Sequence, residues 1–312
     1  MYHIILNPVS GRGNSKAYGE SIATRLEETN SPAILHTTKY PRHAYEIAKE
    51  LCRTSPTGII GIGGDGTIQE IVAGMAQAFN YSKIPIPLGI LPGGSGNDFA
   101  MALAGGKKAY KKYKTIESKT SVLADKITTN STRIVDLITA NMVLSGKTEA
   151  FLVAGNIGLD SRIVHNAIEL KPKHGGRAYL VAAYKSIMQH KNIPLKISVE
   201  GASAEQKPYT LVAICNNRTY GGGLCIAPPA VFNDGKITLC TVDGIGRGKL
   251  SILFPSLLFE KHVNLKEVNF TECTSLKITL AGKETICLDG NLYPVEGDIE
   301  FKILPSVLEV FA

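Results

Sequence analysis

Short apolar runs alternate with amphipathic stretches over the first part of the chain. The apolar runs predict strands at 4–6, 33–36, 58–62 and 87–91. Between them, apolar side chains recur at helical spacing and predict helices at 15–28, 43–53 and 67–79. Short buried strands that alternate with such helices form a mostly parallel sheet covered on both faces. The first domain is therefore predicted to be a three-layer α/β domain.

The pattern changes after residue 131 to strand pairs separated by turn residues. Strands are predicted at 134–142, 150–154, 195–199, 209–215, 236–242, 276–280, 285–288 and 299–303. Helical stretches are predicted at 160–188 and 249–262. This texture predicts a β-rich, antiparallel, sandwich-like second domain. The polar stretch 116–131 has few large apolar side chains, and it places the boundary between domains 1–130 and 131–312.

Length and composition agree with two globular domains. The chain has 312 residues, of which 44% are hydrophobic and 20% are charged. No stretch approaches the ~20 apolar residues of a membrane-spanning helix, and the chain leads straight from Met1 into an apolar strand without a basic leader. The six cysteines show no CxxC spacing. We therefore expect a cytoplasmic protein with reduced thiols.

The net charge narrows the class of partner only slightly. A formal charge of +7 favours contact with an anionic surface, which could belong to nucleic acid, acidic phospholipid or nucleotide phosphates. Charge alone does not choose among these three.

The strongest local motif is a glycine-rich turn that follows a predicted strand and opens a predicted helix. Its residues are Gly63, Gly64, Asp65, Gly66 and Thr67. Glycines let backbone N–H groups approach phosphate oxygens closely, the helix N-terminus favours negative charge, and a carboxylate in the turn can hold Mg²⁺. The motif therefore predicts a phosphate-binding turn.

Two other interpretations of this turn were weighed. Gly61, Gly63 and Gly66 satisfy the GxGxxG dinucleotide fingerprint, which requires an acidic residue about twenty positions on, at the end of the next strand. That strand ends in Pro92 and glycines, so the dinucleotide interpretation is rejected. The remaining alternative is that Thr67 and Glu70 form a capping box with no role in binding.

Two more turns have a similar composition. The turn after the strand 87–91 carries Gly94, Ser95, Asn97 and Asp98, and Ser95 with Asp98 could equally form a capping box. It misses the GxSxG nucleophile motif at the last glycine. The turn after the first strand carries Asn7, Ser10 and Gly11. The chain contains no Walker-type phosphate loop.

These three motifs, in this order and spacing, resemble the diacylglycerol kinase catalytic domain family, which includes sphingosine kinases and bacterial lipid kinases. Four further segments continue the resemblance over nearly the whole chain. They are Thr38 with the His-Ala pair that follows, the glycine-rich turn 155–160, the turn 220–223, and 227–235 with its Asp234-Gly235 pair.

The resemblance implies an ATP site in the cleft between the two domains. The residues implied to contact the nucleotide are Asn7, Ser10, Gly11, Thr38, Gly63, Gly64, Asp65, Gly66, Thr67, Gly94, Ser95 and Asn97. Mg²⁺ is implied to be held by Asp65, Asp98 and Asp136, and Asp234 to hold a structural Mg²⁺.

The resemblance also implies that Asp289 is the general base. Its motif departs from the family pattern because Asn291 stands where a Glu is expected. Asp289-Gly290 and Asp234-Gly235 could each be simple hairpin turns instead.

The sequence thus predicts an ATP- and Mg²⁺-dependent lipid kinase, with diacylglycerol as the leading acceptor. The alternatives are a kinase of a soluble acceptor, similar to NAD kinases, and a catalytically impaired nucleotide- or lipid-binding regulator. Peripheral contact with an anionic membrane is expected, and nucleic acid is not an expected partner. The segment 107–114 could rest on lipid headgroups or be a solvated helix face, and 250–259 could enter a membrane interface or be buried. Whether the chain forms a homodimer stays open.

Overall fold

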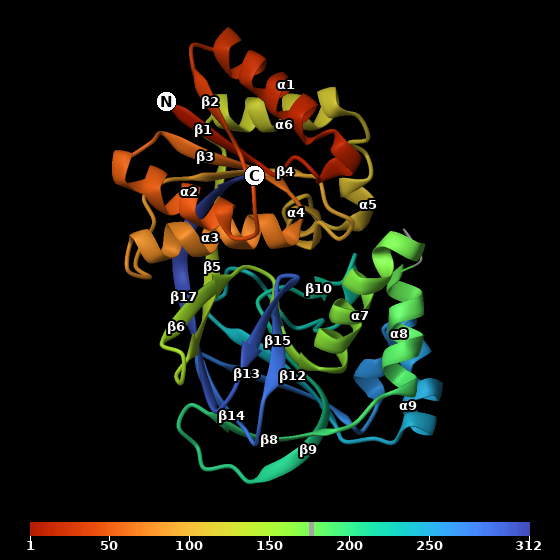
Figure 1. Cartoon of the computed structure of the whole chain (residues 1–312). Helices are drawn as coiled ribbons and strands as arrows, with labels where there is room; N and C mark the ends of the chain where they lie inside the picture. Colours follow the sequence, from red (N-terminus) through yellow and green to blue (C-terminus); the bar gives the residue numbers. More distant parts are fainter. Residues whose placement is uncertain (175–177) are drawn as a thin grey trace.

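The computed structural model describes residues 1–174 and 178–312, and its first layer system is an α/β domain (Figure 1). Four strands form its sheet and pair in parallel in the order β4-β3-β1-β2. Their bounds are β1 (Tyr2–Leu6), β2 (Ala33–Thr37), β3 (Gly58–Gly63) and β4 (Leu88–Pro92). The prediction of a mostly parallel sheet is confirmed.

Helices cover both faces of this sheet because the side chains of a strand alternate between its faces. Ile4 and Ile60 face a core shared with α1 (Ser15–Glu28) and α6 (Ile116–Thr128). Ile5 and Ile59 face the core on the other side, where α2 and α3 pack against each other. The remaining helical elements of this domain are α2 (His43–Leu51), α3 (Asp65–Ala78), α4 (Asp98–Leu103), α5 (Lys107–Tyr110), η1 (Gly11–Gly13) and η2 (Cys52–Thr54).

The sequence did not predict helix α6. Most of the polar stretch 116–131, in which the boundary between the domains is placed, forms this helix, which buries Leu123, Ala124 and Ile127. Its few apolar residues recur at helical spacing and cover the sheet beside α1. An apolar stripe this narrow is difficult to recognise as a helix in an otherwise polar segment.

The second domain consists of antiparallel strands around a separate apolar core. Every strand pair within it is antiparallel. Its strands are β5 (Thr132–Met142), β6 (Lys147–Phe151), β7 (Ala154–Gly158), β8 (Ile193–Val199), β9 (Gln206–Cys215), β10 (Thr219–Tyr220), β11 (Leu224–Cys225), β12 (Ile237–Asp243), β13 (Val268–Cys273), β14 (Ser275–Leu280), β15 (Glu284–Leu288), β16 (Asn291–Val295) and β17 (Asp298–Phe311). The predicted β-rich second domain is confirmed.

Helices lie along one side of this domain (Figure 1). The predicted stretch 160–188 forms two helices that pack against each other, α7 (Leu159–His174) and α8 (Ala178–Met188). The stretch 249–262 forms α9 (Arg247–Leu253) followed by the 3₁₀ turns η4 (Phe254–Phe259) and η5 (Lys261–Asn264). Within the described residues, no helix has both the length and the apolar character that a membrane span requires.

The last strand joins the two domains in a way that the sequence did not predict. β17 pairs along its length with β5 in the second domain. Near its end, Val310 pairs in parallel with Leu88 of β4, so the last residues of the chain extend the first sheet. Two continuous strands, β5 and β17, therefore connect the two layer systems and hold the faces of the cleft to one another.

Candidate active site

The three glycine-rich turns meet at the carboxyl ends of β1, β3 and β4. The N–H of Gly11 donates to the carbonyl of Gly93 (2.5 Å), and the N–H of Gly93 donates to the carbonyl of Gly63 (2.7 Å). The Asn7 amide donates to the Thr67 hydroxyl at 3.1 Å. These contacts place the three predicted phosphate turns in one continuous surface, because parallel strands end at the same edge of the sheet.

Glycine is required where the turn at Gly63–Thr67 touches the turn at Gly94–Asp98. A Cβ on Gly94 would lie 2.5 Å from the Cα of Gly64, and a Cβ on Gly64 would lie 3.1 Å from the Cα of Gly94. Two backbones at this distance leave no room for a side chain on either residue. The close approach explains the glycines without any reference to a ligand, and it brings the backbone of both turns to the floor of the cleft.

The capping interpretations of these turns are wrong. The N-cap of α3 is Gly64, which makes no side-chain capping bond, and Glu70 accepts a hydrogen bond from the N–H of Arg42 at 3.0 Å. The N-cap of α4 is Asn97, whose amide pairs with both backbone groups of Gly94 at 2.7 Å. Asp98 points elsewhere, as described below, and is not part of a cap.

Asp65 is half-buried at the start of α3. Its carboxylate accepts hydrogen bonds from the N–H groups of Asn97 (2.7 Å) and Asp98 (2.8 Å). Burial raises its pKa to about 6, with a further contribution from the charge of Asp98. A Cβ on Gly96 would lie 2.6 Å from Oδ2 of Asp65 and 3.1 Å from Oδ2 of Asp98, so the two carboxylates lie close together.

Asp98 connects this pair to the second domain. Its carboxylate accepts hydrogen bonds from the N–H groups of Gly222 (2.9 Å) and Gly223 (2.7 Å) in the turn between β10 and β11. Both glycines have positive φ angles, of 87° and 88°, which glycine adopts at no steric cost. Burial raises the pKa of Asp98 as well. The conformation of that turn therefore aims two donors at one carboxylate across the cleft.

The predicted metal ligands fall into two pairs. Asp65 lies beside Asp98, as described above. Asp136 accepts hydrogen bonds from the N–H groups of Gly235 and Ser306, both at 2.7 Å. Burial raises the pKa of Asp234, and the nearby charge of Asp136 adds to this. In residues 1–174 and 178–312, no three His, Cys, Asp or Glu side chains form a metal-binding group, so the predicted trio with Asp136 does not assemble.

The Asp65–Asp98 pair nevertheless fits a magnesium ion. Mg²⁺ is usually held by one or two carboxylates together with water and substrate phosphates. Two adjacent carboxylates beside a phosphate-type turn supply that donor set. A bound cation would also relieve the electrostatic repulsion between the two carboxylates. Asp65 and Asp98 are therefore the residues that would hold Mg²⁺ next to the triphosphate.

Asp289 occupies a two-residue hairpin turn between β15 and β16, where Leu288 pairs with Asn291. Asp289 and Gly290 both have positive φ angles, of 45° and 94°, as in a type I′ turn. The hairpin interpretation is thus correct, and the same turn also places the Asp289 side chain in the cleft.

The Asp289 carboxylate is held by three backbone donors of the loop between β6 and β7. It accepts hydrogen bonds from the N–H groups of Leu152 (2.7 Å), Val153 (3.0 Å) and Ala154 (2.8 Å). Burial still raises its pKa to about 7. A carboxylate has about four lone-pair positions, so one remains free for a substrate hydroxyl.

Asp289 and Asp65 line the same small, open pocket between the domains. The first domain contributes Gly63, Gly64, Asp65 and Asn97 to its wall, and the second contributes Leu152, Val153 and Asp289. Two other predicted residues, Thr38 and Ser95, do not line this pocket. Thr38 donates its N–H to the carbonyl of Leu6 at the end of β1 (2.9 Å), and Ser95 is exposed in the loop before α4.

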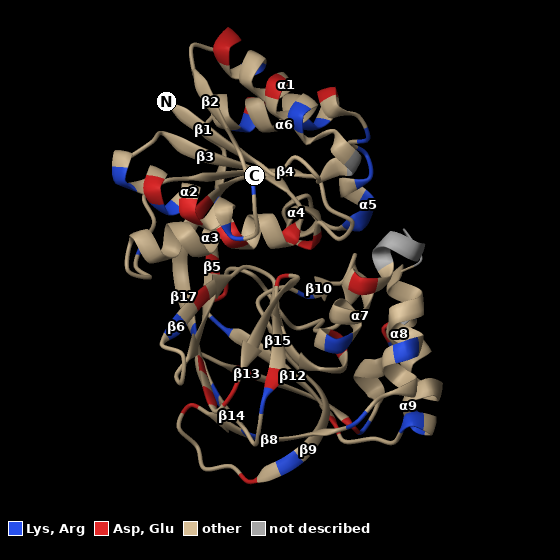
Figure 2. Ribbon diagram, in the orientation of Figure 1, with Lys and Arg blue, Asp and Glu red and all other residues tan. Residues whose placement is uncertain are grey.

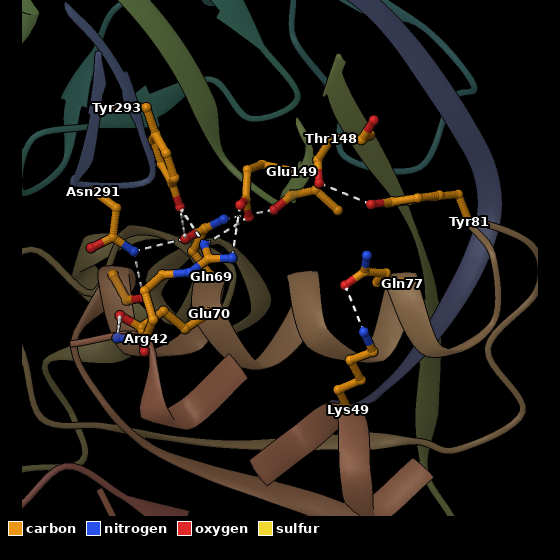
Figure 3. A network of polar contacts seen from close by, with 12 residues as sticks. Arg42, Lys49, Gln69, Glu70, Gln77, Tyr81, Thr148, Glu149, Asn291 and Tyr293 are labelled. Atoms are coloured by element: carbon orange, nitrogen blue, oxygen red, sulfur yellow. Dashed lines mark hydrogen bonds and ion pairs between the residues drawn. The ribbon is translucent and has the colours of Figure 1, made fainter. Parts of the chain in front are cut away.

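A network of polar contacts joins the two domains beside the cleft, and the sequence did not predict it (Figure 3). The Asn291 amide donates to the carbonyl of Gly66 (2.9 Å) and to Oε1 of Gln69 (2.7 Å), and Tyr293 donates to the same Gln69 oxygen. Arg42 pairs with the buried carboxylate of Glu149 at 2.8 Å. Asn291 therefore fastens the second domain to α3. Its partners lie far away in the sequence, so no local pattern reveals them.

A second, apolar cavity of about 80 Å³ lies in the second domain beside α9 and η4. Its wall includes Leu250, Leu253, Phe254, Leu257, Ile226 and Val242. Asp160 lies at its polar end, where Tyr220 donates a hydrogen bond to the carboxylate. Burial raises the pKa of Asp160 to about 6. No sequence motif marked this cavity, because its wall comes from several distant segments.

Comparisons with known proteins agree with this geometry. Residues 1–136 match the diacylglycerol kinase catalytic domain, and residues 154–312 match the YegS C-terminal NAD kinase beta sandwich-like domain. A diacylglycerol kinase of Mycobacterium tuberculosis is 24% identical over 306 residues, which are 98% of this chain and 93% of that protein. One from Bacillus subtilis is 26% identical over 288 residues, which are 92% and 88% of the two chains.

Solved structures share the fold. A diacylglycerol kinase structure from Bacillus anthracis has a TM-score of 0.69 and 21% identity, with 99% of this chain and 96% of that chain covered. An NAD kinase from Archaeoglobus fulgidus in complex with ATP has a TM-score of 0.55 and 11% identity, with 100% and 94% covered. With both family models matched in order, the chain belongs to the diacylglycerol kinase catalytic domain family, and its second domain matches the YegS C-terminal NAD kinase beta sandwich-like domain.

Proposed function

We propose that this protein transfers the γ-phosphoryl group of Mg²⁺-ATP to the hydroxyl of a membrane lipid, with diacylglycerol as the leading acceptor. The observation that carries the proposal is the position of the apolar cavity relative to Asp289. The N–H of Asp289 donates to the carbonyl of Ala154 (3.0 Å) at the start of β7, and Leu159 and Asp160, just after its end, line the cavity.

The two places lie at opposite ends of β7, a distance that one long acceptor molecule would span. β7 has five residues, and at ~3.3 Å per residue a strand of this length spans about 15 Å. A hydroxyl at Asp289 and an apolar tail in the cavity would therefore belong to a long molecule with one polar end. Burying such a tail in a cavity lined by Leu, Ile, Val and Phe is favourable by ~25 cal/mol per Å² of apolar surface.

In phosphoryl transfer, one set of residues would bind the nucleotide and another would act on the acceptor. The turns at Gly63–Gly66 and Gly93–Gly94 present backbone to the phosphates. Asp65 and Asp98 would hold Mg²⁺, which supplies charge neutralisation on the transferring phosphoryl group. Asp289 accepts the proton of the acceptor hydroxyl as the new P–O bond forms and the bond to the β-phosphate oxygen breaks. A carboxyl with a pKa of about 7 suits a general base at neutral pH.

Asn291 does not count against this assignment. Because its amide donates to Gly66 and Gln69, it positions the first domain against the second and leaves proton transfer to Asp289. Two alternative functions remain. The similarity to an NAD kinase suggests a kinase of a soluble acceptor, and the second alternative is a regulator without transfer activity. The apolar cavity favours the lipid, since a dinucleotide acceptor would not bury apolar surface there.

The test is transfer of labelled phosphate from Mg²⁺-ATP to a panel of lipids in mixed micelles and to NAD. The wild-type protein is compared with Asp65→Asn, with Asp289→Asn and with Asp125→Asn, which changes an exposed carboxyl on α6. We expect transfer to lipid that both cleft variants abolish and Asp125→Asn retains. Transfer to NAD instead would identify a soluble-acceptor kinase, and ATP binding without any transfer would identify a regulator.

A further inference from the structure

The apolar cavity beside α9 and η4 contains few polar atoms that can recognise a ligand. Residues 247–259, which form α9 and η4 on one side of it, include no Asp or Glu (Figure 2). Most of the lining side chains are apolar, and Cys240 contributes a thiol. Among the described residues of the wall, the side chains that carry oxygen or nitrogen atoms are Asp160, Thr210, His262 and Glu267. Polar recognition in this cavity therefore depends on these four side chains.

Three of the four already have partners within the protein. The Asp160 carboxylate accepts a hydrogen bond from Tyr220. The Thr210 hydroxyl donates to a carbonyl at the end of β12 at 3.0 Å. Glu267 forms an ion pair with Lys249. These three groups are thus satisfied without a ligand.

His262 is the exception. Its side chain lies in η5 and is 7% exposed. Nε2 donates to the carbonyl of Ile226, another residue of the cavity wall, at 3.0 Å. A carbonyl only accepts, so Nε2 carries the ring hydrogen, and in the neutral ring Nδ1 is then an acceptor. Nδ1 is buried and has no hydrogen-bond partner. Such atoms are rare in folded proteins, because an unpaired buried polar atom is destabilising.

A trapped water would satisfy Nδ1 poorly. A buried water is stable when it makes roughly two to four hydrogen bonds. Around Nδ1, the other lining groups are apolar or already have partners. The cavity has a volume of about 80 Å³, which is more space than one water needs. The group that Nδ1 lacks is therefore a single hydrogen-bond donor on an otherwise apolar molecule.

From this arrangement we propose that the cavity prefers an acceptor lipid whose apolar tail carries one hydrogen-bond donor, such as a hydroxyl group, and that Nδ1 of His262 accepts this bond. His262 is thus a specificity-determining residue for the tail and takes no part in transfer. An unsubstituted tail would leave Nδ1 buried without a partner, so the cavity discriminates between two tails that differ by one hydroxyl. The inference rests on the proposed function, because it concerns the tail of the phosphorylated lipid.

Two small probes test the cavity without any phosphoryl transfer. Phenol and toluene have nearly the same shape and differ by one hydroxyl donor. Calorimetry measures the Kd of each probe for the full chain and for His262→Phe, His262→Gln and Val242→Ala. His262→Phe keeps a ring without hydrogen-bonding atoms, whereas a glutamine amide can donate to Ile226 and also accept. Val242→Ala changes an apolar side chain of the same wall and is the matched control.

We expect His262→Phe to raise the ratio of the phenol Kd to the toluene Kd by about tenfold or more, because phenol alone loses its acceptor. His262→Gln and Val242→Ala should keep the wild-type ratio. The ratio is measured on folded protein, which thermal melting checks, so a merely structural role of His262 would not change it. An unchanged ratio in His262→Phe would overturn the proposal, as would failure of the wild-type protein to bind either probe.

A comparison of lipids needs only the wild-type protein. Transfer from Mg²⁺-ATP is measured in mixed micelles to distearoylglycerol and to a series in which one stearoyl chain carries a hydroxyl at successive positions. We expect at least one position to lower the KM by about fivefold or more. Equal KM values across the series would overturn the proposal. If the probes behave as expected and no lipid is phosphorylated, the role of His262 stands and the kinase assignment fails.

Discussion

The two sides of the cleft are built in different ways. The side proposed to bind the nucleotide consists of backbone: three turns that approach one another closely, with no space for a side chain on Gly94 beside Gly64. The acceptor side consists of side chains, with Asp289 at one end of β7 and a cavity of leucines and other apolar residues beyond the other end. Backbone sites leave glycine motifs in a sequence, whereas side-chain cavities are assembled from residues that no motif connects.

The largest expected effect concerns Asp289, the proposed general base. Asp289→Asn removes the base and should lower the rate of transfer in a single turnover by about 10²–10⁴-fold. ATP affinity should change little, because the nucleotide turns are untouched. Asp125→Asn is the control, and thermal melting monitors the three amides that Asp289 holds. A rate close to that of the wild type would show that the hydroxyl loses its proton elsewhere.

On the nucleotide side, the effect should come through the backbone. Gly94→Ala forces a Cβ to within 2.5 Å of the Gly64 Cα, and it should lower the free energy of unfolding by about 1–3 kcal/mol. ATP binding, measured by calorimetry, should weaken as the turns separate. Gly282→Ala is the matched control, since a Cβ there meets nothing within 4 Å. Equal stability of the two variants would contradict the close contact.

The pH dependence of transfer should be set by Asp289 between about pH 6 and 7, because Asp65 on the other side of the cleft has the lower pKa, of about 6. The folded-state pKa of Asp289 is raised from 3.8 to about 7 by burial, so the folded protein releases this proton at a higher pH than the unfolded chain. The contribution of this group to the stability of the folded state is therefore fully present below pH 3.8. It is lost progressively as the pH rises from 3.8 through about 7. The proposed base acts in its ionised form, so the single-turnover transfer rate, measured across this range, should rise about tenfold between pH 6 and 7 and level off above 7. Below pH 6 it should fall more steeply, because Asp65 is then protonated as well. A rate independent of pH between 6 and 7 would contradict the assignment.

Filling the apolar cavity should affect the acceptor alone. Leu257→Trp places a larger ring in the wall of the cavity, and the KM for a long-chain diacylglycerol should rise about tenfold. The KM for ATP should stay constant. Ile252→Trp, a change of a neighbouring side chain that faces solvent, is the control. A tenfold rise in the KM for ATP would mean that the cavity serves the nucleotide.

The smallest effect should arise where the two sides meet. Asn291→Glu replaces an amide donor by a carboxylate facing the oxygens of Gly66 and Gln69. We expect the free energy of unfolding to fall by about 1 kcal/mol, because two acceptors lose their donor. Chemical denaturation measures this against Asn269→Glu, an exposed position on β13. If Asn291→Glu were more stable than the wild type, the Asn291 amide would not stabilise the contact between the two domains.

The sequence predicted the parts of the molecule that depend on local patterns. Period and glycine spacing located the parallel strands, the antiparallel second domain and the three turns around Gly63, Gly94 and Gly11. Family resemblance was needed to select Asp289, because a buried base in a hairpin looks like any Asp-Gly turn.

The remainder depends on contacts between distant segments. The pairing of Val310 with Leu88 returns the chain end to the first sheet, and Gln69 meets Asn291 across the cleft. Asp136 joined Asp234 rather than the Asp65–Asp98 pair, although all four carboxylates follow similar sequence cues. Helix α6 was missed because its apolar stripe is narrow. In each case the deciding partner lies too far away in the sequence for periodicity to reveal it.

The central claim is that the acceptor side binds a lipid, and a competition in one vessel tests it most directly. Wild-type protein receives labelled Mg²⁺-ATP together with diacylglycerol in mixed micelles and NAD in solution, and the label is partitioned between organic and aqueous phases. The account predicts at least about tenfold more label in the organic phase, a factor equivalent to 1.4 kcal/mol of discrimination. Label that accumulates as phosphorylated dinucleotide in the aqueous phase would contradict it.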